Sequence, residues 1–598
     1  MARLHSSLIP LALSLALSAC ASLPSGDGAS QAAGAEAPET SQTSDPTSPS
    51  TEVAKAPLAT NADDHGPAAH KRAQAQYHVL AGEMAAGRNE PAIAAREFLR
   101  ALSIVPDATL ARRATELALS ARDGALSAAA AKRWLQIAPG SVEPREVIAR
   151  LALRTGELEV VHEQAKAIID GHRQGPAEGF RHVALILSAD RDAAEPVQSV
   201  LARLVDEHRQ LAGAHYAMAL AALRYDNLVQ AEASARKALA LEAESRDYQL
   251  LMVGVLVRKP ALAEADQRMA RLTQQQPEDA RDLRMAYVKL LLEARQRAHA
   301  RQTLHKALQQ DGKHDDARYA LGIMSINDGE LERARQLLQS LADDPDRATE
   351  IQFQLGRVAE AQSRFADALA HYEDAQDGDR QVEAVLRRAV VLGQLQRLDE
   401  GRALLANWRH RAPALEQRFL LAEGELLVEV GQHAEAVSFY SLALDSDPAN
   451  PDLLYGRSLA HEKNHDLARA EADLRSILAD NPQDDRAMNA LGYMLTVHTQ
   501  RYAEAHKLIS RALELSPEDP AIIDSMGWVE YKLGDTESAR EYLEKAYAQV
   551  QDPEIAAHLG EVLWHLGERE RAQQIWDRAL GTEPDHEVLR ETLQRLRP

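Results

Sequence analysis

A pattern of small and large residues recurs along most of the chain and constrains its fold more than any other feature. In the clearest copy, small residues stand at Gly424 and Ala436, a large aromatic residue at Tyr440 and a proline at Pro448, and the same offsets return from Gly560. Fifteen such anchors follow one another at a mean spacing of about 34 residues, which predicts a stack of one repeated helical unit. The anchors are Gly82, Ala118, Ala149, Ala184, Ala219, Val253, Val288, Gly322, Gly356, Ala389, Gly424, Gly456, Gly492, Gly527 and Gly560.

The residue types at these offsets fit a pair of closely packed helices. Small residues let two helices approach, a large residue sixteen positions after the anchor fills the space between them, and proline ends the second helix. Aromatic residues are only 4% of the chain although 45% of it is hydrophobic. Most of the hydrophobic residues are therefore aliphatic residues and alanine, a composition that favours helices over sheets.

This pattern resembles the tetratricopeptide repeat (TPR), a helix–turn–helix unit of 34 residues. The resemblance implies an all-α fold, a TPR solenoid wound as a right-handed superhelix, with about 15 repeats. We expect N-terminal repeats over residues 75–170, a main solenoid over 177–585 and a capping helix over 586–598, in which apolar residues recur at helical spacing. The Gly171–Pro176 stretch is the weakest joint of the predicted stack and a candidate flexible point.

The N-terminus has the features of an exported, lipid-anchored protein. A short apolar run ends in Leu17-Ser18-Ala19-Cys20, which resembles the lipobox of bacterial lipoproteins and contains the single cysteine of the chain. We expect a signal peptide over residues 1–19 and lipidation of Cys20. Residues 20–71 are almost all small or polar, so we expect a disordered tether. Because alanine and not aspartate follows Cys20, the resemblance implies the outer membrane, facing the periplasm.

Charge and composition exclude several functional classes. A net charge of −22 argues against a nucleic-acid binder, and one cysteine excludes an intrachain disulfide framework. His461 to His465 read HExxH, the pattern of zinc proteases. The repeat register, however, places His461 near the end of a helix and His465 in the next turn, so the two rings would diverge. We therefore predict no enzyme activity, no metal and no cofactor, and contact with the membrane through the lipid alone.

The first helix of each TPR lines the concave face of a solenoid, where partners bind. In the last repeats the corresponding positions are rich in aromatic residues, which dominate interface energetics. Glu530 occupies a position where the family usually has tyrosine, so the helix could be rotated and the aromatic side chains could belong to the core; both alternatives stay open. The candidate partner-binding residues are Asn489, Tyr493, Trp528, Tyr531, Lys532, Trp564 and His565.

The last 120 residues, with the segments NALGYML and DSMGWVEYKLGD, resemble the C-terminal part of the long TPR lipoproteins of proteobacteria. That family includes the lipoprotein adaptor of periplasmic carboxyl-terminal processing proteases. The resemblance implies a non-catalytic adaptor that binds such a protease and helps deliver peptidoglycan hydrolases to it. The alternative is a structural scaffold of an envelope machine that exports or assembles polysaccharide, pili or outer-membrane proteins.

Overall fold

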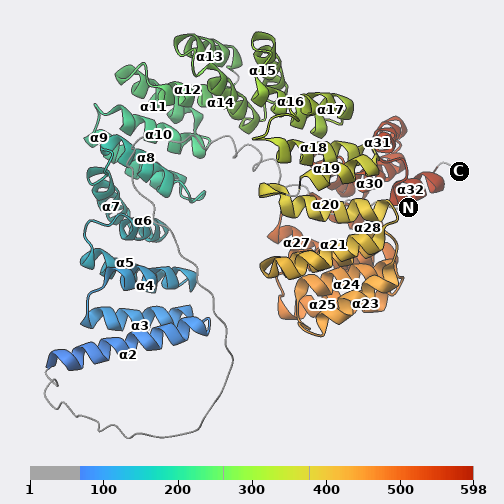
Figure 1. Ribbon diagram of the computed structural model, residues 1–598, viewed down its shortest axis with the longest axis horizontal. Coiled ribbons are helices and arrows are strands. Elements are labelled where there is room, and N and C mark those ends of the chain that lie inside the picture. Colours follow the sequence, from blue (N-terminus) through green and yellow to red (C-terminus); the bar gives the residue numbers. More distant parts are fainter. Residues whose placement is uncertain (1–66, 260, 376, 597–598) are drawn as a thin grey trace, which may run out of the picture. The chain divides into compact units, whose positions relative to one another are not determined.

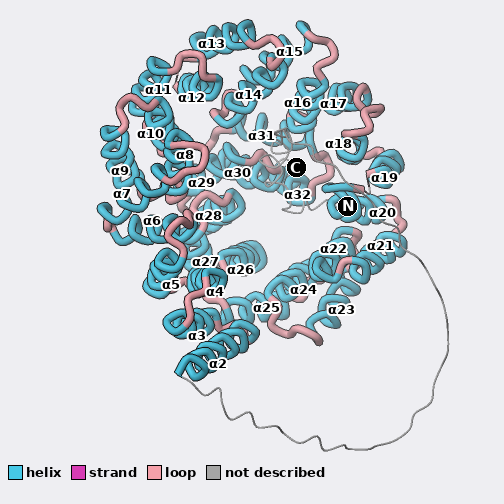
Figure 2. The backbone as a smooth tube through the Cα atoms, turned by 60° about the vertical axis from the view of Figure 1, so that its left-hand side comes forward, coloured by secondary structure: helices cyan, strands magenta, loops and turns pink. Residues whose placement is uncertain are grey.

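The computed structural model describes residues 67–259, 261–375 and 377–596. Within these ranges the backbone forms helices and loops and no strand (Figure 2). The chain divides into two compact units, one ending at Ala317 and the other beginning at Arg318. The predicted signal peptide, Cys20 and the tether up to residue 66 lie outside the described residues. Residues 67–71, which composition assigned to the tether, belong to the first helix.

The first unit consists of antiparallel helix pairs (Figure 1). Its helices are α2 (Pro67–Gly87), α3 (Pro91–Ile104), α4 (Ala108–Ser120), α5 (Gly124–Ile137), α6 (Glu143–Thr155), α7 (Leu158–Asp170), α8 (Pro176–Leu187), α9 (Ala194–Glu207), α10 (Ala212–Arg224), α11 (Leu228–Leu241), α12 (Arg246–Arg258), α13 (Leu262–Gln275), α14 (Ala280–Glu293) and α15 (Arg297–Gln310). The next helix, α16 (Asp315–Asn327), contains the boundary between the units.

The second unit continues the same alternation and adds the short 3-10 helices η2 (Gly378–Arg380) and η3 (Pro413–Leu415). Its α-helices are α17 (Leu331–Gln339), α18 (Ala348–Ala361), α19 (Phe365–Asp374), α20 (Gln381–Gln394), α21 (Leu398–Arg411), α22 (Glu416–Glu429), α23 (His433–Leu444), α24 (Pro451–Lys463), α25 (Leu467–Asp480), α26 (Asp485–His498), α27 (Tyr502–Leu515), α28 (Pro520–Leu533), α29 (Thr536–Gln549), α30 (Pro553–His565), α31 (Arg569–Thr582) and α32 (Glu587–Leu596).

Every predicted anchor lies in the first helix of a pair. Gly82 is in α2, Gly322 in α16 and Gly560 in α30, and the other anchors occupy the even-numbered helices between them. The prediction of an all-α repeat fold with about 15 helix pairs is therefore confirmed. The Gly171–Pro176 segment connects α7 to α8, and one apolar cluster runs from Ala149 on one side of it to Ala221 on the other.

Close packing at the anchors explains why they are small. A Cβ atom added to Gly424 would lie 2.2 Å from the ring of Tyr440, and one added to Gly456 in the next repeat would lie 2.6 Å from the same ring. Tyr440 is thus held between two glycines on successive first helices, and its side chain is fully buried. The aromatic residue sixteen positions after the anchor contacts two repeats. Packing between these repeats therefore depends on a small residue at the anchor and a large one at this position.

Helix α32 covers the C-terminal end of the second unit. Leu589 is buried, and Val588, Leu593 and Leu596 pack against the apolar cluster of α30 and α31. Arg and Glu residues occupy the outer side of this helix. This is the predicted cap, which an open repeat array needs because its last unit would otherwise expose apolar surface.

Candidate protein-binding surface

The first helices of the last repeats form an inner layer that carries all the predicted binding residues. Helix α26 packs on α28, α28 on α30, and α30 on α32. Asn489 and Tyr493 lie on α26, Trp528, Tyr531 and Lys532 on α28, and Trp564 and His565 on α30. A chain of ring contacts that includes His558 links Tyr493, Trp528, Tyr531 and His565, whereas Trp564 packs on Trp576 of α31.

Trp528 lies at the centre of a stack of rings. Its indole is stacked on the imidazole of His558 at 4.1 Å between centroids and on the ring of Tyr531 at 5.2 Å. The ammonium group of Lys532 lies 4.2 Å from the centroid of the indole. Only 6% of Trp528 is exposed. Its environment is that of a core residue, and of the two rings that cover it only Tyr531 is partly exposed.

His558, one of the stacked rings, forms a buried pair with Asp524. His558 Nδ1 lies 3.0 Å from an Asp524 carboxylate oxygen, and His558 is only 2% exposed. Burial alone would lower the pKa of His558, but the Asp524 carboxylate and its hydrogen bond raise that pKa above its usual value. The Asp524 carboxylate therefore favours the protonated imidazole, and the contact between the two side chains joins α30 to α28.

A second buried carboxylate joins α30 to the cap. Glu561 is 1% exposed and accepts two hydrogen bonds from the Arg595 guanidinium of α32, at 2.6 and 2.5 Å. Burial would raise the pKa of Glu561, but Arg595 lowers it below its usual value. The hydroxyl of Tyr531 lies 3.3 Å from Glu561 and 3.0 Å from His565 Nδ1. The surface residues Tyr531 and His565 are thus held by groups that the cap fixes.

Tyr493 and Asn489 extend the surface toward α26. The Tyr493 hydroxyl donates a hydrogen bond to Glu554, two repeats later in the sequence, and its ring lies 6.1 Å from His558. Burial raises the pKa of Tyr493 well above its usual value. The side-chain oxygen of Asn489 is buried and has no hydrogen-bond partner within the described ranges.

The predicted residues therefore differ in how far a partner could reach them. Trp528 is buried; Asn489, Tyr493, Tyr531, Lys532 and Trp564 are half-buried; His565 is exposed. Trp564 packs 5.7 Å from Trp576, and the Arg569 guanidinium lies 4.9 Å from its ring centroid. Burial lowers the pKa of Lys532. The surface combines aromatic edges with one cation and one exposed imidazole.

The two pairs of this network, Asp524 with His558 and Glu561 with Arg595, are not among the seven predicted residues. The members of each pair are one repeat apart, since Asp524 and His558 are 34 residues apart, as are Glu561 and Arg595. Residues one period apart occupy equivalent positions on neighbouring first helices. Opposite charges at that separation were the signal that could have identified both pairs.

The two histidines of the HExxH segment do not lie on one helix. Helix α24 ends at Lys463, His461 is buried within it, and His465 adopts a left-handed backbone conformation with φ 60° in the following turn. Glu462 instead contacts His498 Nε2 at 2.9 Å. Over the described part of the chain, no group of three or more His, Cys, Asp and Glu side chains is placed to hold a metal ion.

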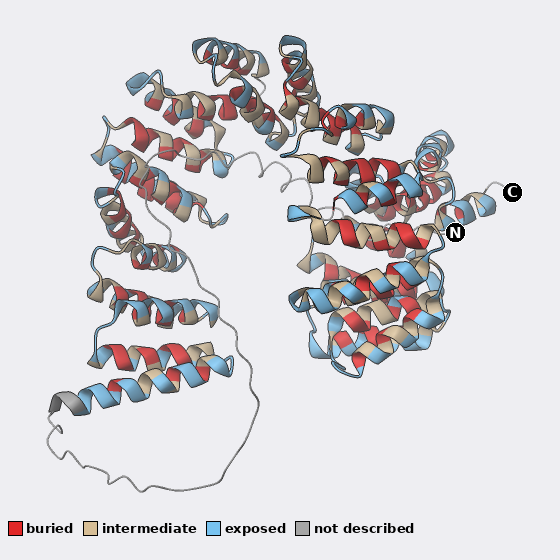
Figure 3. Cartoon of the chain, viewed as in Figure 1, coloured by how far each residue is buried: buried red, intermediate tan, exposed pale blue. Residues whose placement is uncertain are grey.

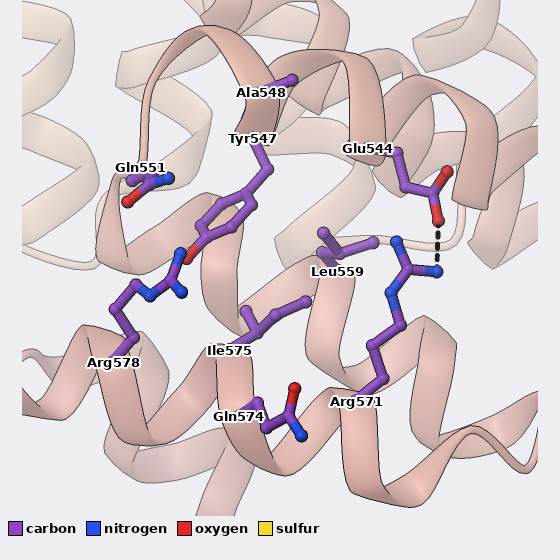
Figure 4. Close-up of a pocket in the computed structure, with 9 residues that line it drawn as sticks. All are labelled: Glu544, Tyr547, Ala548, Gln551, Leu559, Arg571, Gln574, Ile575 and Arg578. Carbon is purple, nitrogen blue, oxygen red and sulfur yellow. Dashed lines mark ion pairs between the residues drawn. The ribbon is translucent and has the colours of Figure 1, made fainter. Parts of the chain in front are cut away.

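An open pocket of about 310 Å³ lies among the last repeats (Figure 4). Tyr547, Leu559 and Ile575 form its apolar floor between α29, α30 and α31. Arg571 on its rim pairs with Glu544 at 2.7 Å. The pocket is separate from the seven predicted residues.

None of the helices traced between residues 67 and 596 has both the length and the apolar character needed to cross a bilayer.

Comparison with known proteins identifies the repeat. Two tetratricopeptide-repeat profiles match residues 455–520 and residues 291–352 and 530–596, together less than half of the chain. The TPR repeat-containing protein PA4667 of Pseudomonas aeruginosa is 41% identical over 194 residues, which are 32% of this chain and 33% of that protein. The chain thus matches about a third of the length of this relative.

The solved structures that match this chain have lower sequence identity to it. Yeast Tom70 is 12% identical, with 88% of this chain and 99% of that chain covered and a TM-score of 0.32. A thermophilic TPR protein of Thermus thermophilus is 22% identical, with 30% and 97% covered and a TM-score of 0.28. The profile matches and the helix pairs agree, and the described residues of this chain form an all-α solenoid of tetratricopeptide repeats, a fold suited to binding and scaffolding other proteins.

Proposed function

We propose that the chain is a non-catalytic adaptor held on the periplasmic side of the outer membrane through a lipid on Cys20. Its partners are a periplasmic carboxyl-terminal processing protease and the peptidoglycan hydrolases on which that protease acts. The lipobox-like segment Leu17–Cys20 and the resemblance of the last repeats to TPR lipoproteins support this assignment. The TPR fold supports its coarser part, binding to other proteins.

The observation that carries the proposal is the aromatic surface of the last repeats. Tyr531, Lys532 and His565 present partly or fully exposed side chains beside the Asp524–His558 and Glu561–Arg595 pairs, and the half-buried Trp564 lies on the same helix as His565. A surface whose side chains are already ordered loses little conformational entropy on binding. Aromatic residues and a cation are also the groups that contribute most at protein interfaces.

Co-purification from detergent-solubilised envelopes tests this function. We expect the full chain to recover a processing protease and a cell-wall hydrolase, identified by mass spectrometry. Lys532→Glu combined with His565→Ala should reduce recovery about tenfold, because the double change removes a cation and an exposed ring from the binding surface. Leu442→Ala is the matched control, since Leu442 is exposed on the second helix α23, away from this surface.

Three results would contradict the proposal. These are the absence of both enzymes from the purified material, recovery of components of an export or assembly machine in their place, and equal recovery with the double variant. The second result would favour the alternative function as an envelope scaffold.

The anchor has its own test. Replacing Cys20 by Ala should release the protein from the membrane fraction into the soluble periplasm, because the thiol that would carry the lipid is gone. Thermal unfolding of the repeats should not change, since Cys20 lies outside them. Fractionation followed by immunoblotting measures the distribution. A Cys20→Ala chain that stays with the membranes would show that the lipobox interpretation is wrong.

A further inference from the structure

One register position of the second unit carries four charged side chains. It is the residue directly after the anchor in the first helix of a repeat. Its charged occupants are Arg357 on α18, Glu425 on α22, Arg457 on α24 and Glu561 on α30. Tyr493 and Trp528 hold the same position on α26 and α28. Equivalent positions of stacked repeats lie on one face of the array, so the four charges belong to the layer of first helices that also carries these two rings.

The chain itself neutralises two of the four charges. The Arg457 guanidinium donates hydrogen bonds to both oxygens of the Asp473 carboxylate, at 2.8 and 2.7 Å. Glu561 accepts the two hydrogen bonds from Arg595 described above. A charge held partly out of water costs free energy unless a countercharge accompanies it. Arg457 and Glu561 therefore have their partners within the structure.

Arg357 has no such countercharge among the described residues. Its guanidinium donates a hydrogen bond to the side-chain oxygen of Gln354 at 2.9 Å, and no carboxylate pairs with it. Glu360, one turn further along α18, pairs with Arg387 of α20 instead. Figure 3 shows that α18 and α20 are buried or half-buried along almost their whole length. Burial lowers the pKa of Arg357, because it favours the neutral form of a cation.

Glu425 carries an unpaired charge of the opposite sign. It is exposed, whereas every other residue from Phe419 to Glu429 is buried or half-buried. Within the described part of the chain, its carboxylate has neither a hydrogen bond nor an ion pair. Water reaches the carboxylate, but the protein around it removes part of its hydration. This desolvation, together with the charge of Glu429, raises the pKa of Glu425. A cation from another molecule would relieve that cost.

We propose that α18, α20 and α22 together bind an extended segment of a partner protein, which presents an acidic, an apolar and a basic residue along the direction from α18 to α22. The acidic side chain lies against Arg357 and the basic side chain against Glu425. Val390, half-buried at the same register position on α20, contacts the apolar side chain between them. Opposite charges at the two ends of one surface favour a partner with the complementary charges and disfavour one with like charges at both ends.

The spacing of the helices sets the spacing of the three residues in the partner. Packed neighbouring helices are about 8–10 Å apart, so Arg357 and Glu425, two helices apart, are separated by roughly 16–20 Å. An extended polyproline-II chain advances about 9 Å every three residues and presents every third side chain on the same face. The three contacts therefore fall at the first, fourth and seventh residues of the segment. An α-helix of the same length would advance only about 9 Å and cover half of that separation.

This charged surface and the aromatic surface of α26, α28 and α30 are different parts of the same layer. The inference goes beyond the proposed function and does not depend on the identity of the partner. The two proposals are therefore tested separately. Co-purification can fail while the charged surface still binds its segment, and the segment can fail to bind while the protease and the hydrolase are still recovered.

Isothermal titration calorimetry of the full chain carrying Cys20→Ala, which is made without lipid, tests the binding. The probes are three acetylated and amidated heptapeptides that differ only at their ends. The first is Asp-Ser-Ser-Leu-Ser-Ser-Lys, the second has Asp at both ends, and the third has Lys at both ends. We expect the Asp/Lys peptide to bind at least about tenfold more tightly than either of the others, because each of those places like charges together at one end.

Charge reversal tests the two contacts one at a time. Arg357→Glu should make the Lys/Lys peptide the tightest ligand, and Glu425→Lys should make the Asp/Asp peptide the tightest. A gain of binding of this kind cannot come from unfolding. Arg271→Glu on α13 and Glu541→Lys on α29 are the matched controls, since both residues are exposed on second helices. Both controls should leave the order of the three peptides unchanged.

Four results would overturn the proposal. The Cys20→Ala chain could bind none of the peptides at about 1 mM, the weak end of specific binding. It could bind all three equally, or it could prefer a peptide with like charges at both ends. A preference for the Asp/Lys peptide that persists in both reversal variants would show that Arg357 and Glu425 are not the residues that read the charges.

Discussion

Replacing Trp528 by alanine should lower the free energy of unfolding of the last repeats by about 3–5 kcal/mol, the range found when buried aromatic residues are truncated. The indole is 6% exposed and lies between the imidazole of His558 and the ring of Tyr531. Its removal leaves a cavity and also uncovers the buried Asp524–His558 pair. Urea unfolding of the full chain, followed by far-UV circular dichroism, measures the change.

The exposed neighbour His565 provides the contrast. His565→Ala should change the free energy of unfolding by less than about 0.5 kcal/mol, because the side chain faces solvent. If Trp528→Ala weakened partner binding while urea unfolding stayed unchanged, Trp528 would be an interface residue and its assignment to the core would be wrong. The two variants together separate stability from recognition on the same surface.

The repeat pattern predicts the fold because it reports contacts within one helix pair. A small anchor and a large residue sixteen positions later touch directly, as Gly356 and Tyr372 do at 2.6 Å from an added Cβ atom. Such contacts recur at the same offset in several repeats, as at Gly82 with Phe98 and Gly560 with Trp576, so the pattern appears more than once in the chain. Helix order and the place of the cap follow from this periodicity.

Which side chains of the inner layer are buried or paired depends on contacts between repeats. The pattern within one repeat does not contain those contacts. The sequence left open whether α28 was rotated, because Glu530 replaces the usual tyrosine. In the structure Glu530 contacts His506 of α27 at 3.0 Å, and Trp528 stays on the inner side. Whether Trp528 is buried depends on His558, one repeat later. That covering ring could not be inferred from the position of Trp528 alone.

The other prediction with a large effect on stability concerns Gly560, the last anchor, and Trp576, the large residue sixteen positions after it. Trp576 is fully buried, and a Cβ atom added to Gly560 would lie 2.1 Å from its Nε1 atom. Trp576→Ala should therefore lower the free energy of unfolding of the last repeats by about 3–5 kcal/mol. Gly560→Ala alone should lower it by about 1–3 kcal/mol, because the indole must move to admit a methyl group.

In the Trp576→Ala chain, Gly560→Ala should raise the free energy of unfolding, whereas in the wild type it should lower it. Once the indole is absent, the methyl group of Gly560→Ala enters the vacated space and also gains about 1 kcal/mol of helix propensity. Gly581→Ala is the matched control, since a Cβ atom there meets nothing within 4 Å, and its effect should be equal in both backgrounds. Urea unfolding of the four proteins measures the coupling. If Gly560→Ala destabilised the Trp576→Ala chain as much as the wild type, packing between this anchor and its aromatic partner would not be what requires a glycine at position 560.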